Sequence, residues 1–437
     1  MAYINSSKST DILFCNLDNP TEPSEDAVEF VCNSKNFPSF SEGLTEALKH
    51  SGFTGPSNID SKTQYLYQKL QSIGSTIKKR TINDWFSGKH APRYRSTDRI
   101  NMYAICFALN FDRATTEYFF SNVYFTRCFD YHTINEAVYS YCIANGRSYK
   151  TAQKLINTIE KHPATKTCDN LPHKYTYFVK QKIINIHTDQ ELSSFLIEEK
   201  QNFQCTNQTA LDTILDLRKK IKGDDSSSSK DIIHKLKKGK SLNNAEIAKC
   251  GLLIQEIIFD SSNYSQKQDY NYIRQCINNA NVFSDDFLLR QLLTACNGIR
   301  STHANIPSII KANFPSKKVL SNLLKSVTTP TTKPSYDATR KMLILLHYYV
   351  FWCSYKLMAS TNSLILADTP DSNDYEQEIS DLLVDAGYFP LYNKNPYDWI
   401  FLYSAKQQPD PLNALKEILG DLCNNDNNDN NDNNDYL

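Results

Sequence analysis

The stretch that decides the fold of this chain is residues 75–111, STIKKRTINDWFSGKHAPRYRSTDRINMYAICFALNF. Ile82, Trp85 and Phe86 lie at positions i, i+3 and i+4, so they share one side of a short helix. Gly88 is placed to end that helix. The spacing predicts a helix at 80–87 whose aromatic side enters a core. Its opposite side carries the polar residues Arg80, Thr81, Asn83, Asp84 and Ser87.

Positive charge is concentrated around this helix. Between Lys78 and Arg99 the chain has seven Lys or Arg residues and two Asp, a net charge of +5, whereas the whole protein has no net charge. Any attraction to a nucleic acid must therefore come from a local patch. The loop and helix start that follow the predicted helix supply cations suited to phosphate contact, namely Lys89, His90, Arg93, Arg95 and Arg99.

Two further helices are predicted before this one. SKTQYLYQKLQSIG predicts the second of them, and Gly74 is placed to end it in a left-handed conformation. FSEGLTEALKHSGF predicts the first, for which Ser41 is the candidate cap. Its apolar residues fall on one face of the helix: Phe40, Leu44, Ala47 and Leu48.

These elements resemble the lambda-repressor-like (XRE-type) helix-turn-helix family of bacterial DNA-binding regulators. That family pairs a recognition helix ending in Trp-x-x-Gly with a basic, Pro-containing loop and a helix that closes on Ala-Leu. The resemblance covers about 70 residues and implies that the helix at 80–87 enters the major groove and that the protein binds as a dimer. The matching residues are Thr81, Ile82, Trp85, Gly88, Lys89, Pro92, Ile100, Ala108 and Leu109.

We therefore expect a sequence-specific DNA-binding transcription regulator. Its expected partners are double-stranded DNA, a second copy of the chain, and a protein bound by the helical body. Base readout is assigned to the polar side of the helix, namely Arg80, Thr81, Asn83 and Asp84. Phosphate contact is assigned to the surrounding cations Lys78, Lys79, Lys89, Arg93 and Arg95.

Three alternatives stay open. Trp85 and Phe86 are also what an ordinary core would contain, and runs of Lys and Arg are usually solvated faces. The chain is otherwise a non-catalytic helical interaction scaffold, such as an accessory protein of a mobile element or a defence system. A third alternative is RNA binding through the same basic patch, with exposed Tyr residues stacking on bases.

The rest of the chain predicts an all-α fold interrupted by polar breaks such as GDDSSSSKD and TTPTTKPS. A helix starting at Ser335 or Asp337 is apolar on nearly every side, so it is expected at the centre of a core. The predicted divisions are an arm (1–37), the helix-turn-helix domain (38–112), three helical domains (113–222, 232–327 and 336–423), and a disordered Asn/Asp tail (424–437).

Two distant segments share a loose plan. FDYHTINEAVYSYCIANGRSYKTAQKLINTI and GYFPLYNKNPYDWIFLYSAKQQPDPLNALKEIL each join a turn to an aromatic helix, a polar break and a second helix. The alignment that pairs Asn135 with Asn395 and Tyr139 with Trp399 is too loose to define a repeat. We interpret both segments as helix-hairpin packing units.

Other features point away from several classes of protein. The twelve Cys are scattered without zinc-ligand spacing, and most, like Cys106, occur in apolar helical patterns typical of buried thiols. The longest apolar run, 342–353, is too short to span a bilayer, so a cytoplasmic protein is expected. No nucleotide-binding loop or catalytic motif stands out, so we expect neither an enzyme nor a cofactor or metal. His347, inside the apolar helix, is interpreted as a core histidine.

Overall fold

The computed structural model describes residues 25–33, 36–92, 96–129, 131, 133–163, 175–204, 207–223, 251–259, 317–328, 336–361, 371–407 and 410–424, with isolated residues of 231–250. Within these ranges all the regular secondary structure is helical, apart from an isolated β-bridge between Gly223 and Cys250. The predicted all-α class is therefore confirmed for these residues. Most of the predicted arm and nearly all of the predicted tail lie outside them, and the domain boundaries stay a prediction.

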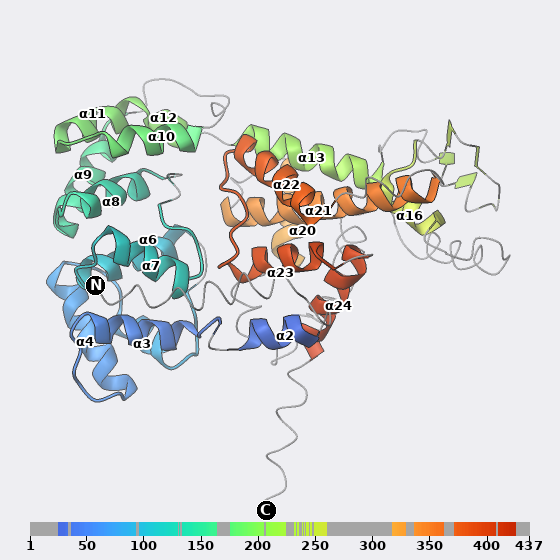
Figure 1. Cartoon of the computed structure of the whole chain (residues 1–437). Coiled ribbons are helices and arrows are strands. Elements are labelled where there is room, and N and C mark those ends of the chain that lie inside the picture. Colours follow the sequence, from blue (N-terminus) through green and yellow to red (C-terminus); the bar gives the residue numbers. More distant parts are fainter. Residues whose placement is uncertain are drawn as a thin grey trace, which may run out of the picture.

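The helices form two lobes, and each has its own hydrophobic core (Figure 1). The amino-terminal lobe, from Phe40 to Gln204, encloses a buried cluster that is rich in aromatic residues. Its helices are α3 (Phe40–His50), α4 (Ile59–Ser72), α5 (Lys79–Phe86), α6 (Ser96–Ala108), α7 (Arg113–Asn122), α8 (Ile134–Ala144), α9 (Tyr149–Lys161), α10 (Tyr175–Ile184), α11 (Asp189–Glu198) and α12 (Lys200–Gln204).

The first helices of this lobe begin and end where the sequence supplies caps. Ser39 caps α3 and forms a capping box with Glu42, so the prediction that Ser41 is the cap is wrong. Ser41 Oγ instead donates a hydrogen bond to the carbonyl oxygen of Phe86, 2.8 Å away at the end of α5. Gly74 follows α4 with φ +83°, the left-handed conformation predicted for it. This stop leaves the chain free to turn into α5.

A buried lysine closes the far end of the lobe. The side chain of Lys200 lies at the start of α12 and is 6% exposed. Its ammonium group donates to the carbonyl oxygens of Ile159 (3.1 Å), Glu160 (2.6 Å) and His162, at the end of α9. The last carbonyls of a helix have no partner within the helix, so this lysine acts as a C-terminal cap supplied from elsewhere in the chain.

The carboxyl-terminal lobe is built around the predicted apolar helix, which begins at Tyr336. Residues 342–346 of this helix are all at most 1% exposed, so its central position is confirmed. A helix from the start of the chain also packs here, against the last two helices. The helices of this lobe are α2 (Glu25–Cys32), α13 (Gln208–Lys222), α16 (Leu252–Phe259), α20 (Lys317–Thr328), α21 (Tyr336–Thr361), α22 (Ser372–Asp385), α23 (Pro396–Ala405) and α24 (Pro411–Asn424).

Side chains from each lobe bond to the backbone of the other. Arg127 Nη2 donates to the carbonyl oxygen of Leu391 at 3.1 Å. In the opposite direction, Asn395 Nδ2 donates to the carbonyl oxygen of Phe125 at 2.7 Å. The ring of Phe125 packs in the core of the carboxyl-terminal lobe, with its centroid 5.5 Å from that of Phe37. The two lobes therefore meet through reciprocal contacts.

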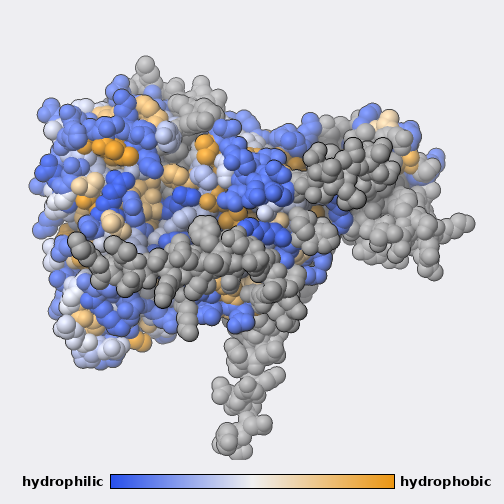
Figure 2. Space-filling model, in the orientation of Figure 1, coloured by the Kyte–Doolittle hydropathy of each residue, from blue (hydrophilic) through white to orange (hydrophobic). Residues whose placement is uncertain are grey.

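The thiols follow the sequence-based expectation in most of the described positions. Cys106, Cys142, Cys250 and Cys353 are buried, whereas Cys32 is exposed. Burial raises the pKa of Cys142 to about 12 and that of Cys250 to about 11, so both thiols are neutral near pH 7. None of the described helices combines the length and the apolar character needed to cross a bilayer. The face drawn in Figure 2 is largely hydrophilic, with small, separate apolar spots.

Candidate nucleic-acid interface

One side of α5 is fixed in the core of the amino-terminal lobe. Ile82 is fully buried, and Trp85 and Phe86 are 3% and 4% exposed. The rings of Trp85 and Phe40 meet edge to face, with centroids 5.9 Å apart, so α3 supports α5 from behind. The hydrogen bond from Ser41 to the last carbonyl of α5 adds a second link between these two helices. The orientation of α5 is thus set by packing and not by its own length.

A lysine of α4 supplies a further link that the sequence did not reveal. Lys62 is 9% exposed, and its ammonium nitrogen lies 5.1 Å from the centroid of the Phe86 ring and 3.1 Å from Thr45 Oγ1. Burial lowers the pKa of Lys62, and the charge of Lys49 lowers it further. Lysines on a helix surface usually point to water, so the spacing alone gave no sign that this one holds α3, α4 and α5 together.

The residues predicted to read bases lie on the other side of α5. Arg80 is exposed, and Thr81, Asn83 and Asp84 are each partly exposed. The described residues provide no ion pair for Arg80 and no side-chain hydrogen bond for Asn83, so both have donors to offer. A guanidinium group and an amide beside each other on a helix can recognise guanine and adenine edges.

The predicted phosphate contacts flank the two ends of α5. Lys78 and Lys79 are exposed just before and at its first residue, and Lys89 is exposed just beyond its last turn. Lys79 Nζ donates to Gln64 Oε1 at 2.6 Å, which leaves its charge uncompensated by any acidic side chain in the described residues. The other two predicted phosphate contacts, Arg93 and Arg95, lie outside the described residues.

Arg99 has a different role from the one expected. Arg99 is 7% exposed, and its guanidinium forms a bidentate ion pair with Glu136, with Nε–Oε1 2.6 Å and Nη2–Oε2 3.2 Å. It also donates to Thr126 Oγ1 and to the carbonyl oxygen of Arg127. The expectation that Arg99 contacts a phosphate is therefore wrong. The sequence could not show this, because its carboxylate partner lies 37 residues further along the chain.

The arrangement around α5 supplies hydrogen-bond donors and positive charge. Within the described part of the chain, no group of three His, Cys, Asp or Glu side chains is placed to hold a metal ion. The polar side of α5 combines Arg, Thr, Asn and Asp side chains with Lys at both ends, all accessible from solvent. Such a surface suits an extended anionic partner that presents both charges and hydrogen-bonding groups.

Comparisons with known proteins do not identify the chain. No protein-family model matches it, and no curated protein or solved structure is significantly similar to it. What can be said of its function therefore rests on the geometry of its own residues.

Proposed function

We propose that this chain is a sequence-specific DNA-binding regulator of transcription that places α5 in the major groove. Its main support is the two-sided packing of α5. The aromatic side is held rigidly by α3 and α4, and the polar side faces solvent with base-reading side chains. A site built on a rigid element positions its hydrogen-bonding groups better than one on a loop.

The size of α5 also suits this partner. An α-helix with its side chains is about 10–12 Å thick, similar to the width of the major groove of B-DNA. A helix that lies in the groove has a phosphate backbone on either side, within reach of long basic side chains at its ends. Lys78 and Lys79 at one end and Lys89 at the other would then each meet a backbone strand. Arg80, Asn83 and Asp84 would face the base edges.

The test uses the full chain and fluorescence anisotropy with a pool of random duplexes, followed by sequencing of the bound fraction. Binding should weaken steeply as salt rises, because each phosphate contact releases counterions. Replacing both Lys78 and Lys89 by Ala should weaken binding to all duplexes. It should also make the negative slope of log K against log salt less steep by about two. Replacing Asn83 by Ala should instead change the selected sequence.

Two exposed lysines of the same lobe serve as matched controls. Lys161 and Lys182 lie on α9 and α10, away from α5. Replacing both by Ala removes the same charge as the Lys78/Lys89 variant but leaves the proposed DNA contacts in place. The control variant should keep the wild-type salt slope. The proposal is wrong if the wild-type chain binds no duplex at low salt, or if the control variant loses as much affinity as the Lys78/Lys89 variant.

A further inference from the structure

A second helix repeats the pattern of α5. Residues 79–86 read KRTINDWF, and residues 317–324, the start of α20, read KKVLSNLL. Both segments begin with two basic residues and place apolar residues at positions i, i+3 and i+4. In both helices these positions are at most 4% exposed, so each helix buries the same side. The buried residues are Ile82, Trp85 and Phe86 in α5, and Leu320, Leu323 and Leu324 in α20.

The four helices that follow also correspond. In α6–α9 and in α21–α24, the first helix packs on the second and the fourth, the second on the third, and the third on the fourth. The two sets differ in that α6 also packs on α8, and in that α20 packs on α21 whereas α5 packs on α3 and α4. We call α5–α9 the amino-terminal unit and α20–α24 the carboxyl-terminal unit. The loose sequence similarity between the α8–α9 and α23–α24 segments thus reflects one shared helical arrangement.

A buried acidic residue marks the same position in both units. Thr133 caps α8 and Asn395 caps α23, and each cap accepts a hydrogen bond from the backbone of the third helical residue. That third residue is Glu136 in α8 and Asp398 in α23, with 5% and 0% exposure. The correspondence corrects the alignment by two residues, because Thr133 and not Asn135 matches Asn395. Both carboxylates lie near a helix N-terminus, which stabilises negative charge.

Each of these carboxylates binds an arginine from the first helix of its four-helix set. Arg340 pairs with Asp398 through two hydrogen bonds of 2.6 and 2.8 Å, as Arg99 pairs with Glu136. Each arginine also donates to the loop between the second and third helices. Arg99 reaches the carbonyl oxygen of Arg127 at 3.1 Å, and Arg340 reaches that of Pro390 at 3.0 Å. Two unrelated helical arrangements would not be expected to share the capping residue, the buried acid, its arginine partner and the loop carbonyl that the arginine also binds.

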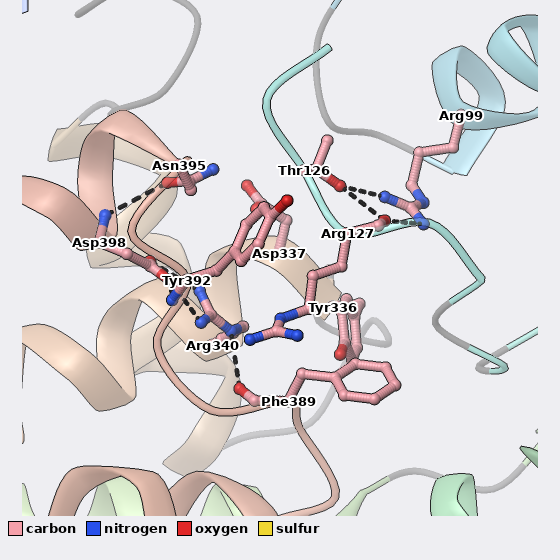
Figure 3. A pocket seen from close by; sticks show the side chains of 10 residues that line it. All are labelled: Arg99, Thr126, Arg127, Tyr336, Asp337, Arg340, Phe389, Tyr392, Asn395 and Asp398. Atoms are coloured by element: carbon pink, nitrogen blue, oxygen red, sulfur yellow. Dashed lines mark hydrogen bonds and ion pairs between the residues drawn. The ribbon is translucent and has the colours of Figure 1, made fainter. Parts of the chain in front are cut away.

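The two equivalent loops contact each other where the units meet (Figure 3). The guanidinium of Arg127 lies 4.6 Å from the ring centroid of Tyr392 and donates to the backbone at Leu391. From the opposite side, Asn395 donates to Phe125. The remaining crevice measures only about 50 Å³, so the loops are closely packed. Both units therefore contribute the loop between the second and third helices of their four-helix set to the junction.

The exposed side of α20 carries groups that can read bases. Val319, which matches Thr81, is 40% exposed, and Asn322, which matches Asp84, is exposed. An amide can bind the edge of adenine, and an apolar side chain can contact the methyl group of thymine. In the sequence, Lys318 stands where α5 has Arg80. The residue types differ from those of α5, so a second helix of this kind would prefer a different sequence.

Given that α5 binds DNA as proposed above, we infer that α20 is a second DNA-reading helix. One chain then acts as a covalent counterpart of a dimer and binds, as a monomer, a site made of two unlike half-sites. The contact between the loops supports this reading, because it joins the two similar units within one chain. Symmetric dimers bind palindromes, whereas two unlike helices require an asymmetric site.

The experiment is selection of bound DNA by the full chain, followed by anisotropy titration on the selected duplex. The expected site contains two different half-sites and binds one chain per duplex. Asn83→Ala should alter one half-site only, and Asn322→Ala should alter the other. Each change should weaken binding to the original site roughly ten-fold or more. Asn157→Ala, at an exposed position of α9, is the matched control and should change neither half-site.

The outcomes separate this inference from the proposal on which it rests. If Asn83→Ala changes the selected site while Asn322→Ala and Val319→Ser do not, α20 does not read DNA and only the inference is wrong. A palindromic site that binds two chains would overturn it equally. If the wild-type chain binds no duplex, the proposed function itself is wrong. Circular dichroism at the working temperature checks that each variant remains folded.

Discussion

The two units use one scaffold but present different surfaces. Both bury an acid at the third position of a helix and pair it with an arginine from the first helix of the set. In both units, the buried side of a short amphipathic helix consists of large apolar side chains. What differs is the exposed side: Arg, Thr, Asn and Asp in α5 face solvent where α20 presents Val319 and Asn322. The internal ion pair is therefore common to both units, whereas the exposed side of the short helix differs between them.

The carboxyl-terminal unit encloses the acid of its ion pair more deeply, although the side chain of Arg340 is 13% exposed and that of Arg99 9%. The helix that carries its arginine, α21, is 26 residues long and packs on α13 and α16 as well as on its own unit, whereas α6 has 13 residues. Burial alone would lower the pKa of the Arg340 guanidinium, but Asp398 beside it reverses that effect and raises the pKa. The side chain of Asp398 is fully buried, compared with 7% exposure for that of Glu136. We therefore expect a larger loss of stability when the buried acid of the carboxyl-terminal unit loses its arginine.

The largest loss of stability should come from removing one arginine of these pairs. Arg340→Met leaves the carboxylate of Asp398 buried without its cation, which costs about 3–5 kcal/mol in the free energy of unfolding. Arg99→Met should cost less, because Glu136 retains slight access to water. Urea unfolding followed by circular dichroism measures both changes.

A double variant tests whether the missing cation is the cause. Arg340→Met with Asp398→Leu removes both charges and should recover part of the loss, since an apolar pair of similar size needs no compensation. Equal losses for the Arg340 and Arg99 variants would show that the two units enclose their ion pairs alike. A loss below 1 kcal/mol at Arg340 would contradict the burial on which the contrast rests.

The next largest effect concerns the joint between the units. Arg127→Ala removes the hydrogen bonds to Pro390 and Leu391 and the contact with Tyr392, which together should contribute about 1–3 kcal/mol. Because this side chain links the lobes, its loss should also reduce their cooperativity. Calorimetry should show one transition for the wild type and a broadened or double transition for the variant.

A surface arginine provides the control for this change. Arg147 pairs with Asp189 at 3.2 Å, but both side chains are well exposed, so Arg147→Ala should destabilise the protein much less than Arg127→Ala. It should leave the shape of the transition unchanged. If Arg127→Ala behaves like Arg147→Ala, the two lobes do not depend on this contact for their cooperative unfolding.

The features that the sequence predicts correctly depend on residues that are close to one another in the chain. The spacing of Ile82, Trp85 and Phe86 predicted which side of a short helix is buried, and the structure places all three in the core. The uniform apolar run after Ser335 predicted a central helix, which α21 is. These predictions hold because a helical period is read within a few neighbouring residues. Which residues touch DNA stays a prediction.

Contacts between residues that are far apart in the sequence could not be predicted from it. Arg99 and Glu136, and likewise Arg340 and Asp398, meet only after several helices have packed, so Arg99 was grouped with the surface cations around it. The similarity of α20 to α5 was hidden because Leu replaces Trp and Phe at its buried positions. The apolar pattern is retained although the side chains differ in size, so residue identity is a weaker guide to equivalence than burial.

The smallest predicted effect is a difference between the units in how stability depends on pH. The seventh residue after the paired arginine is Cys106 in α6 and His347 in α21, and both are buried. Burial lowers the pKa of His347, and the hydrogen bond of 3.0 Å between its Nε2 and Glu378 only partly offsets this. The unfolded chain therefore takes up a proton near pH 6.5 that the folded chain accepts only at lower pH.

Stability should accordingly fall as the pH drops from about 6.5 towards the lower pKa of the folded state, because the unfolded state binds more protons in that window. His347→Gln should lose this part of the pH dependence, measured as urea midpoints between pH 5 and 7.5, while His162→Gln, at an exposed position, should keep it. At the equivalent position of the amino-terminal unit, burial raises the pKa of the Cys106 thiol and keeps it neutral throughout the range. Identical pH profiles for the wild type and His347→Gln would mean that the imidazole is protonated as readily in the folded lobe as in water.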